Sequence, residues 1–507
     1  MNRPKHSAGL GSRYALRRRV TWTLLAVLFI SWGGPAASAF WQSLSSSNFG
    51  AAKADTMPQG GAPVASLNGT NTTVNWAAVA TPGGHAVAGY TVARYSSPSG
   101  GTKIAAGGGC AGTVSGLSCV EQNLPGGTWY YTVTPVISLW TGAESVRSAG
   151  VTVDTTPPTV GVTSISPAPN GAGFNRTSTV TVNLAAVDNT GGSGVANIKY
   201  SVDGGTTVTV NAATAAVNVS GGDGTHTVSY FATDVAGNAS TPQTQTVKID
   251  TILPVVGVTS ISPTPNSRGY YATSPVTVNL GATDVGGSGV ASITYQVDTG
   301  TQVTVAGATA SVSVTGEAAH NISYFATDAA GNSSGSQTQA IAIDFPPTVS
   351  SVTLGSGGAT AKKADAGDTL TIVFSTDMDP HTLCSGWNSS SPNQTVDGTA
   401  SIGTDEVLRF TSTGSTTCTA PSFGSVALVA VYNTSTTSPL NFTASTMAWT
   451  QSTGTLVITL GGSASGGGVA GTNVQQKTPT YTPSSGAADK AGNPLTGTFT
   501  ASSPSKF

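Results

Sequence analysis

Residues 160–167 read Val-Gly-Val-Thr-Ser-Ile-Ser-Pro, and the same eight residues return unchanged at 256–263. Other segments recur in the same order: 180–184 at 276–280, 191–195 at 286–290, and 230–234 at 324–328. The offset falls from 96 to 94 residues along the repeat, which places small deletions between the repeated segments, where loops tolerate them. Self-similarity at one long period predicts two homologous domains in tandem.

Each repeat alternates short Val- and Thr-rich runs with Gly, Asn and Pro about every 8–12 residues, which is typical of a β-sandwich. Proline marks the boundaries of the repeats, at Thr156-Pro157-Pro158, Ile252-Leu253-Pro254 and Phe345-Pro346-Pro347. Because proline fixes φ and extends the preceding residue, we expect these joints to be short and stiff.

The composition of the whole chain also favours β-structure. Only 8% of its 507 residues are charged, 64 are glycine, and the length indicates roughly three to five domains. The formal net charge of −2 hides an uneven distribution, because six basic residues and no acidic ones lie in residues 1–39. Without that segment, 14 basic residues face 22 acidic ones, a net charge of −8. Such a chain lacks the basic surface that nucleic acids bind, so we expect no nucleic-acid partner.

Residues 1–39 are predicted to be a secretory signal peptide. Arg17, Arg18 and Arg19 precede an apolar run that extends to Trp32, and small residues follow at 37–39. This order matches a basic region, an apolar core and a cleavage site after residue 39. The alternative is an uncleaved anchor, because extension of the run to Trp41 approaches the ~20 residues that span a bilayer. Membrane contact is therefore expected only through this segment, and only if it is not cleaved.

The four cysteines are expected to be oxidised in an exported chain. Cys110 and Cys119 lie close together near the N-terminal end, and Cys384 and Cys418 lie together near the C-terminal end. Two whole repeats separate the pairs, so the simplest pairing is Cys110–Cys119 and Cys384–Cys418. Free buried cysteines are the alternative, and zinc is disfavoured because no pair has ligand spacing.

The two repeats resemble bacterial Ig-like domains, particularly the OmpL47-type repeat. The resemblance rests on the segment 200–205, on His226 before Tyr230, and on the loop Asp234-Val235-Ala236-Gly237-Asn238. The second copy retains His320 and the loop 328–332, and has Thr299-Gly300 in place of the double glycine. The resemblance covers about 190 residues and implies an extracellular or surface module, without implying a ligand.

Residues 62–153 resemble a fibronectin type III domain. Trp76 follows a strand-like run, 89–92 forms the next, and Leu124 to Tyr131 resembles the strand with the tyrosine corner. An extra residue leaves open whether Tyr130 or Tyr131 occupies that corner. Residues 368–379 and 489–495 resemble a further bacterial Ig-like family, Big_5, although the C-terminal segment is longer than one such domain.

The resulting division is a signal peptide at 1–39, a flexible leader at 40–61 and a fibronectin type III-like domain at 62–153. Ig-like repeats follow at 154–251 and 252–345, and an Ig-like domain with insertions at 346–507. The predicted fold class is all-β, with four tandem immunoglobulin-like β-sandwich domains behind the signal peptide.

Motifs that carry chemistry are weak in this chain. Residues 107–112 fit G-x-G-x-x-G and residues 331–335 fit G-x-S-x-G, but neither lies in the strand–helix context that such motifs need. His226 and His320 occupy equivalent positions in the repeats and are expected to make structural hydrogen bonds near a strand start. His85 and His381 have no acid–base partner nearby in sequence. We therefore predict no catalytic residues and no cofactor.

The acidic turns are the best functional candidates. Asp188 and Asp284 each precede a G-G-S-G turn, whereas Asp234, Asp328 and Asp489 each open a D-x-A-G-N loop. Carboxylate oxygens on tight turns suit Ca²⁺. The alternative, favoured because no dense carboxylate cluster is evident, is that Asp and Asn only shape the turns. No metal ligand is assigned on this basis.

Four tryptophans could form a sugar-binding platform, although packing in the core or at strand edges is favoured: Trp129, Trp140, Trp387 and Trp449. The predicted function is a non-enzymatic structural or adhesion protein, secreted or on the cell surface, that presents loops to an extracellular protein or polysaccharide. A secreted carbohydrate-binding or enzyme-accessory protein is the alternative. An enzyme within 346–503 would require acids or histidines that converge in a cleft.

Overall fold

The computed structural model describes residues 55–507 except 359, 361, 414–417, 419–422, 463, 469–473 and 505–506. Two compact units divide the described chain: residues 55–159 with the loops 186–197 and 232–240, and the remaining residues. The predicted signal peptide and residues 40–54 of the predicted leader lie outside the described part. Within that part, no helix has the length and apolar character to cross a membrane.

The first module is a two-sheet sandwich. Its strands are β1 (Val64–Asn68), β2 (Asn71–Asn75), β3 (Gly89–Tyr95), β4 (Ile104–Ala105), β5 (Thr113–Val114), β6 (Ser118–Glu121), β7 (Gly127–Ile137), β8 (Trp140–Thr141) and β9 (Val151–Val153). One sheet has the order β1-β2-β6, and the other has the order β4-β3-β7-β8 with β5 on β3 and β9 on β7. Trp76 packs edge-on against Tyr90 between the sheets, with ring centroids 5.4 Å apart. Tyr131 is fully buried and Tyr130 only half-buried, so Tyr131 occupies the core position.

The end of the predicted flexible leader lies along this sandwich. The amide of Gly60 donates to the carbonyl of Ala143 at 3.0 Å, and Gln59 donates to the carbonyl of Glu144 at 2.9 Å. A Cβ at Gly60 would lie 2.1 Å from the carbonyl oxygen of Val133, so only glycine allows this approach. Residues 55–61 are therefore part of the first module, which corrects the prediction of a flexible leader for them.

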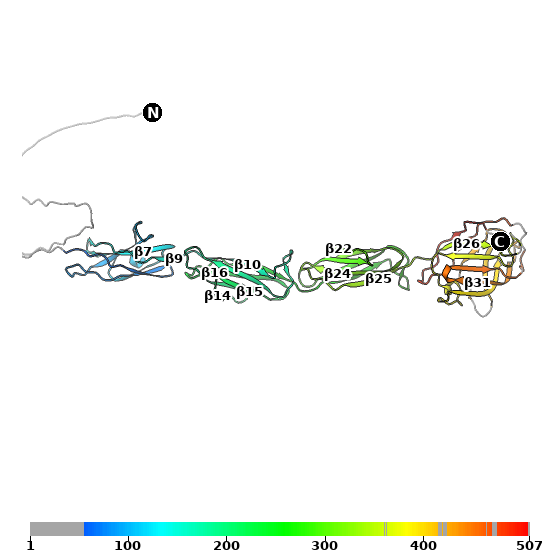
Figure 1. The fold of residues 1–507 in the computed structure, drawn as a ribbon, viewed down its shortest axis with the longest axis horizontal. Helices are drawn as coiled ribbons and strands as arrows, with labels where there is room; N and C mark the ends of the chain where they lie inside the picture. The colour runs from blue at the N-terminus through cyan, green and yellow to red at the C-terminus, as the bar shows by residue number, and fades with distance from the viewer. Residues whose placement is uncertain are drawn as a thin grey trace, which may run out of the picture. The chain divides into compact units, whose positions relative to one another are not determined.

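The two repeats have the same strand order in their sheets, and Figure 1 draws each of them as a β-strand module. The strands of the first are β10 (Thr159–Ser166), β11 (Phe174–Asn175), β12 (Val180–Val187), β13 (Val195–Val202), β14 (Val208–Val210), β15 (Thr214–Val219), β16 (Gly224–Asp234) and β17 (Gln243–Ile249). Those of the second are β18 (Val255–Ser262), β19 (Tyr270–Tyr271), β20 (Val276–Thr283), β21 (Val290–Val297), β22 (Val303–Ala306), β23 (Thr309–Val314), β24 (Ala318–Asp328) and β25 (Gln337–Ile343). The sheets run β10-β12-β15 and β11-β17-β16-β13-β14, and β18-β20-β23 and β19-β25-β24-β21-β22.

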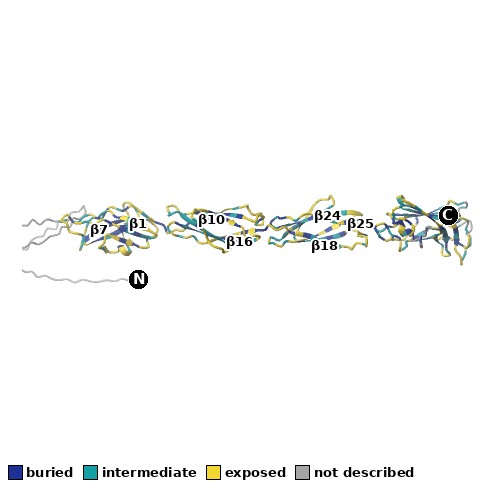
Figure 2. Ribbon diagram, turned by 90° about the horizontal axis from the view of Figure 1, so that it is seen from below, coloured by how far each residue is buried: buried dark blue, intermediate teal, exposed yellow. Residues whose placement is uncertain are grey.

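Period-two alternation explains how these strands form. In β20, Val276, Val278 and Leu280 are buried and the residues between them are half-buried. Successive side chains of a strand point to opposite faces, so one face of each sheet enters the core. In Figure 2 the strands carry buried and half-buried stretches, and many of the exposed residues lie in the loops between them.

The C-terminal module is larger. Its strands are β26 (Val349–Gly355), β27 (Thr369–Phe374), β28 (Asn393–Ile402), β29 (Val407–Ser412), β30 (Ser425–Ala427), β31 (Leu440–Thr450), β32 (Thr455–Thr459), β33 (Thr480–Thr482) and β34 (Phe499–Thr500), and its helix is α1 (Pro380–Leu383). They follow one hydrogen-bonded order, β26-β27-β32-β31-β28-β29-β30-β33-β34, around a single core, and β26 also lies against β34. The predicted fold class, tandem immunoglobulin-like β-sandwiches, is confirmed.

The predicted disulfides are present. Cys110 bonds to Cys119 within the first module, and Cys384 bonds to Cys418 within the last. No free cysteine occurs among the described residues.

Candidate functional site: acidic clusters at the module joints

The D-x-A-G-N loop is a closed turn with one geometry in all three copies. In the second repeat, Asp328 accepts the backbone amide of Asn332 at 2.8 Å and its side-chain amide at 2.9 Å. The amide of Asp328 in turn donates to the carbonyl of Asn332 at 3.0 Å. Gly331 has a φ of +92°, which explains the glycine in the motif, because residues with a Cβ rarely adopt this conformation.

The asparagine of each loop also holds the joint that precedes its own module. Its side-chain amide donates to the backbone carbonyl of the aspartate that follows the last strand of the preceding module. The pairs are Asn238 to Asp154 at 3.0 Å, Asn332 to Asp250 at 3.0 Å and Asn493 to Asp344 at 2.8 Å. The same hydrogen bond therefore recurs at three successive joints.

Each repeat also donates side-chain hydrogen bonds to the D-x-A-G-N loop of the module that follows it. Asn170 donates to the carbonyls of Ala329 and Ala330 at 2.9 and 2.8 Å, and Arg176 donates to that of Gly331 at 3.0 Å. In the second repeat, Asn266 donates to the carbonyl of Ala491 at 3.0 Å, and Arg268 donates to that of Lys490 at 2.6 Å.

Two joints gather three carboxylates each. Asp154, Asp188 and Asp234 form the first cluster, and Asp250, Asp284 and Asp328 form the second. In each cluster one oxygen atom per residue lies within 4.8 Å of the other two. The expectation that no dense carboxylate cluster exists is therefore wrong.

Sequence reasoning missed Asp154 and Asp250, the joint residues of these clusters. They follow the last strands of their modules, whereas the predicted candidates lie on loops of the next module. A signal was present, because an aspartate stands shortly before each proline joint, at 154, 250 and 344.

In the first cluster every carboxylate oxygen accepts a hydrogen bond. Asp154 accepts the amide of Ser193 at 2.8 Å, and Asp188 accepts the amides of Asn189 and Gly194 at 2.9 and 2.6 Å. Burial alone would raise the pKa of Asp154, but the amides of Ser193 and Thr156 outweigh it and hold the pKa below its usual range.

The second cluster is less well satisfied. Asp250 is fully buried; its Oδ1 accepts the amide of Ile252 at 3.1 Å, and its Oδ2 has no hydrogen-bond partner. Asp284 accepts the amide of Gly289 through Oδ2 at 2.8 Å, while its Oδ1 is also buried and unpaired. Burial, together with the negative charges of Asp250 and Asp328, raises the pKa of Asp284.

The third joint lacks such a cluster among the described residues. Burial and the negative charge of Asp489 raise the pKa of Asp344 to about 6. Asp377, which follows β27 of the C-terminal module, pairs with Lys490 at 2.8 Å. A lysine of the chain itself therefore neutralises an acid at this joint.

The predicted histidine role is confirmed. His226 lies near the start of β16 and pairs through Nδ1 with Asp203 at 2.7 Å, and His320 pairs with Asp298 at 2.8 Å. The hydrogen bond to Asp203 raises the pKa of His226, and the same bond lowers that of Asp203. Both aspartates have φ values of +51°, so they shape hairpin turns.

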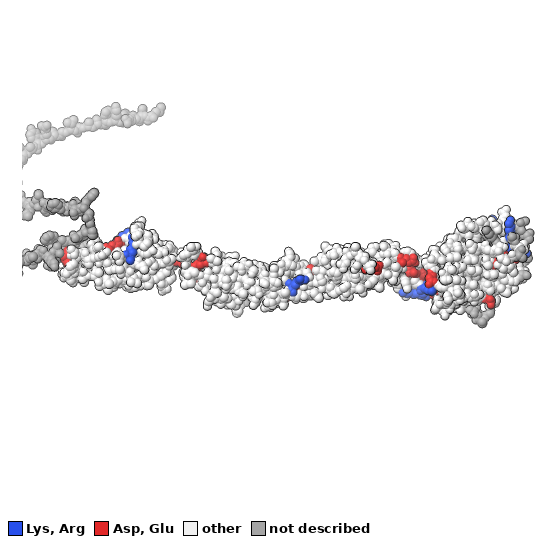
Figure 3. Space-filling view, in the orientation of Figure 1, with Lys and Arg blue, Asp and Glu red and all other residues white. Residues whose placement is uncertain are grey.

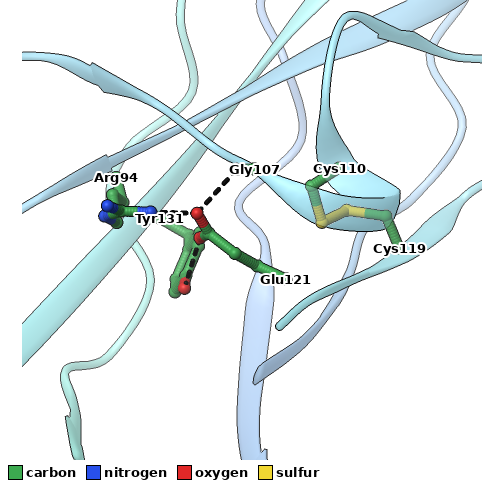
Figure 4. Close-up of a disulfide and its surroundings, with 6 residues drawn as sticks. All are labelled: Arg94, Gly107, Cys110, Cys119, Glu121 and Tyr131. Carbon is green, nitrogen blue, oxygen red and sulfur yellow. Dashed lines mark hydrogen bonds and ion pairs between the residues drawn. A yellow bond between two sulfur atoms is a disulfide. The ribbon is translucent and has the colours of Figure 1, made fainter. Parts of the chain in front are cut away.

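A buried polar cluster lies beside the Cys110–Cys119 disulfide (Figure 4). Glu121 is 1% exposed and pairs with Arg94. It also accepts the amide of Gly107 at 2.6 Å and the hydroxyl of Tyr131 at 2.8 Å. Burial and the bond to Glu121 raise the pKa of Tyr131 above its usual range. These contacts fix the G-x-G-x-x-G segment as part of a stapled loop.

The tryptophans are mainly core residues. Trp129, Trp387 and Trp449 are buried, as favoured, and Trp140 is half-buried. In the described part of the chain these side chains therefore form no exposed flat surface.

The buried acids of the C-terminal module serve its backbone. Asp368 accepts the amides of Gly357 and Gly358, both at 3.0 Å, and Asp379 accepts that of His381 at the start of α1 at 3.1 Å. Asp489 closes its own loop on Asn493.

Comparison with known proteins concerns the fold alone. No family model matches the chain, and no curated protein matches it. Similar solved structures include the fibronectin(III)-like modules of Clostridium thermocellum CbhA, 18% identical, covering 37% of this chain and 95% of that chain with a TM-score of 0.22. The FN1–FN3 domains of chicken CNTN1 are 14% identical and cover 56% of this chain and 99% of that chain, also with a TM-score of 0.22.

Proposed function

We propose that the chain is a non-enzymatic structural or adhesion protein, secreted or held at the cell surface, whose Ig-like modules present loops to an extracellular protein or polysaccharide. The observation that supports this proposal is the repeated contact at the joints. The asparagine of each D-x-A-G-N loop donates to the backbone carbonyl of the joint aspartate, and this bond recurs at all three joints. A hydrogen bond that recurs at every linker suits a protein built of modules in series.

Two further observations support the proposal. Both disulfides lie within single modules, and disulfides persist in oxidising compartments. Charged side chains are sparse on the face shown in Figure 3, which is consistent with a protein that does not bind polyanions. We include in this proposal the resemblance of the repeats to OmpL47-type Ig-like domains, which implies an extracellular or surface module.

The test is surface localisation followed by an attachment assay. We expect antibody to label intact cells, protease to remove the label, and a deletion strain to attach less well to protein- or polysaccharide-coated surfaces until complemented. Label that appears only after permeabilisation, or unchanged attachment by the deletion strain, would contradict the proposal. The carbohydrate-binding alternative predicts polysaccharide retention of the purified chain, and the buried tryptophans make that outcome the less favoured one.

A further inference from the structure

We propose that Asp250, Asp284 and Asp328 form a calcium site at the joint between the two repeated modules. One oxygen from each carboxylate lies within 4.8 Å of the others. Calcium–oxygen distances are about 2.3–2.6 Å, so two oxygens on opposite sides of one ion are about 4.6–5.2 Å apart. The spacing therefore fits ligands of a common ion.

The unpaired oxygens distinguish this cluster from acids that only shape a turn. Asp250 is 0% exposed, so bulk water does not reach its carboxylate. Each of its two oxygens therefore needs a partner within the protein or a bound ion. Its Oδ1 accepts the amide of Ile252, but its Oδ2 has no hydrogen-bond partner. The Oδ1 of Asp284 also has no partner. A buried carboxylate oxygen without a donor is costly unless a cation satisfies it.

The charge of the cluster supports the same conclusion. None of the three aspartates forms an ion pair with a lysine or arginine in the described part of the chain. Arg176 is nearby, but its guanidinium donates to the carbonyl of Gly331. By contrast, Lys490 neutralises Asp377 at the third joint, where no three-carboxylate cluster forms among the described residues.

The donor atoms select the class of ion. Three carboxylates without a cysteine or histidine favour a hard cation over zinc or copper. Calcium takes six to eight oxygens in flexible geometry, whereas magnesium requires a compact octahedron. Water would complete the coordination of calcium here. Asp250 belongs to the joint, and Asp284 and Asp328 belong to the following module, so the ion would tie the joint to that module whatever the protein binds.

The structure offers two substitutions that alter only the unpaired oxygens. In Asp250→Asn, the remaining oxygen can still accept the amide of Ile252. In Asp284→Asn, it can still accept the amide of Gly289. Asp397→Asn is the matched control, because Asp397 is an exposed residue of β28 in the C-terminal module. Asp188→Asn is the comparison at the first joint, where both oxygens of Asp188 accept backbone amides.

The experiment is calcium titration of the full chain by calorimetry after chelator treatment, with magnesium as the competitor. We expect a dissociation constant of about 10⁻⁴–10⁻³ M, as in extracellular modules, weaker binding of magnesium, and at least about tenfold weaker calcium binding in Asp250→Asn and Asp284→Asn. Asp397→Asn should bind as the parent does. No calcium-dependent heat up to about 10 mM, or binding that survives Asp284→Asn and disappears in Asp188→Asn, would overturn the proposal.

Thermal unfolding gives an independent readout. Without calcium, Asp284→Asn should unfold at the same or a higher temperature than the parent, because it removes repulsion among three carboxylates. With calcium, the parent should gain stability and overtake the variant. An equal rise in unfolding temperature with calcium in both proteins would overturn the proposed site. The measurement without calcium shows whether the variant folds.

Discussion

The side-chain amide of Asn332 donates to the backbone carbonyl of Asp250 at 3.0 Å, although the two residues are 82 positions apart and belong to different modules. The same amide donates to Asp328, so one side chain closes its own loop and holds the preceding joint. Asn332 is 8% exposed, so neither bond is easily replaced by water.

Asn332→Ala is expected to destabilise the second repeat and its joint. The substitution leaves the Asp250 carbonyl and an Asp328 oxygen without their partners, at a cost of about 1–3 kcal/mol. In calorimetric unfolding of the full chain, the transition of the second repeat should lie at a lower temperature in the variant than in the parent. Asn321→Ala is the control, because Asn321 is exposed and its backbone amide makes the contact with Asp298. Equal effects of the two substitutions would contradict the role of Asn332.

Arg94→Met should be the more damaging of two charge deletions in the first module. It leaves Glu121, which is 1% exposed, as a buried charge without its cation, and such a loss costs about 3–5 kcal/mol. Lys103→Met breaks the ion pair of the exposed Lys103 with the half-buried Glu144, which keeps its hydrogen bond from Tyr95, and should cost no more than about 1 kcal/mol. The two variants are compared by the denaturant midpoint at which the first module unfolds. Similar midpoints would refute this ranking.

Asp344→Asn should flatten the pH dependence of stability at the third joint. The pKa of Asp344 is raised from 3.8 to about 6, so the folded state favours the protonated carboxyl. Its stabilising contribution is present below pH 3.8 and is lost as the pH rises through about 6. The unfolding temperature of the parent should therefore fall over this interval relative to that of the variant. Asp397→Asn should follow the parent, and parallel curves for all three proteins would argue against a buried, repelled Asp344.

Removal of the C-terminal disulfide should be more costly than removal of the N-terminal one. The two bonds close loops with sequence separations of 34 and 9 residues, and loop entropy gives roughly 4 and roughly 3 kcal/mol. Double alanine variants of each pair, unfolded under identical conditions, measure this difference. A larger loss for Cys110 and Cys119 would show that local packing outweighs loop entropy.

Local and periodic features could be predicted from the sequence. The repeat of residues 160–167 at 256–263 established the tandem domains, and alternation of the kind seen in β20 established the sandwiches. The separation of the cysteines into two pairs was enough to predict both disulfides. Each of these features depends on residues within one strand or one module.

The course of residues 55–61 could not be predicted, because nothing in a Gly- and Ala-rich segment shows that Gly60 fits against Val133. The clusters could not be predicted for a related reason. Asp284 and Asp328 were recognised as turn residues, but Asp250 joins them only when loops of one module close on the joint that precedes it.

The sequence by itself determined the strands, the repeats and the disulfide pairing, because side-chain alternation, period and spacing act along the chain. Only the tertiary structure decided which carboxylates converge and which of their oxygens lack a donor. That outcome depends on contacts between modules, and it leaves the Oδ2 of Asp250 buried and unpaired while the equivalent Asp154 accepts the amide of Ser193.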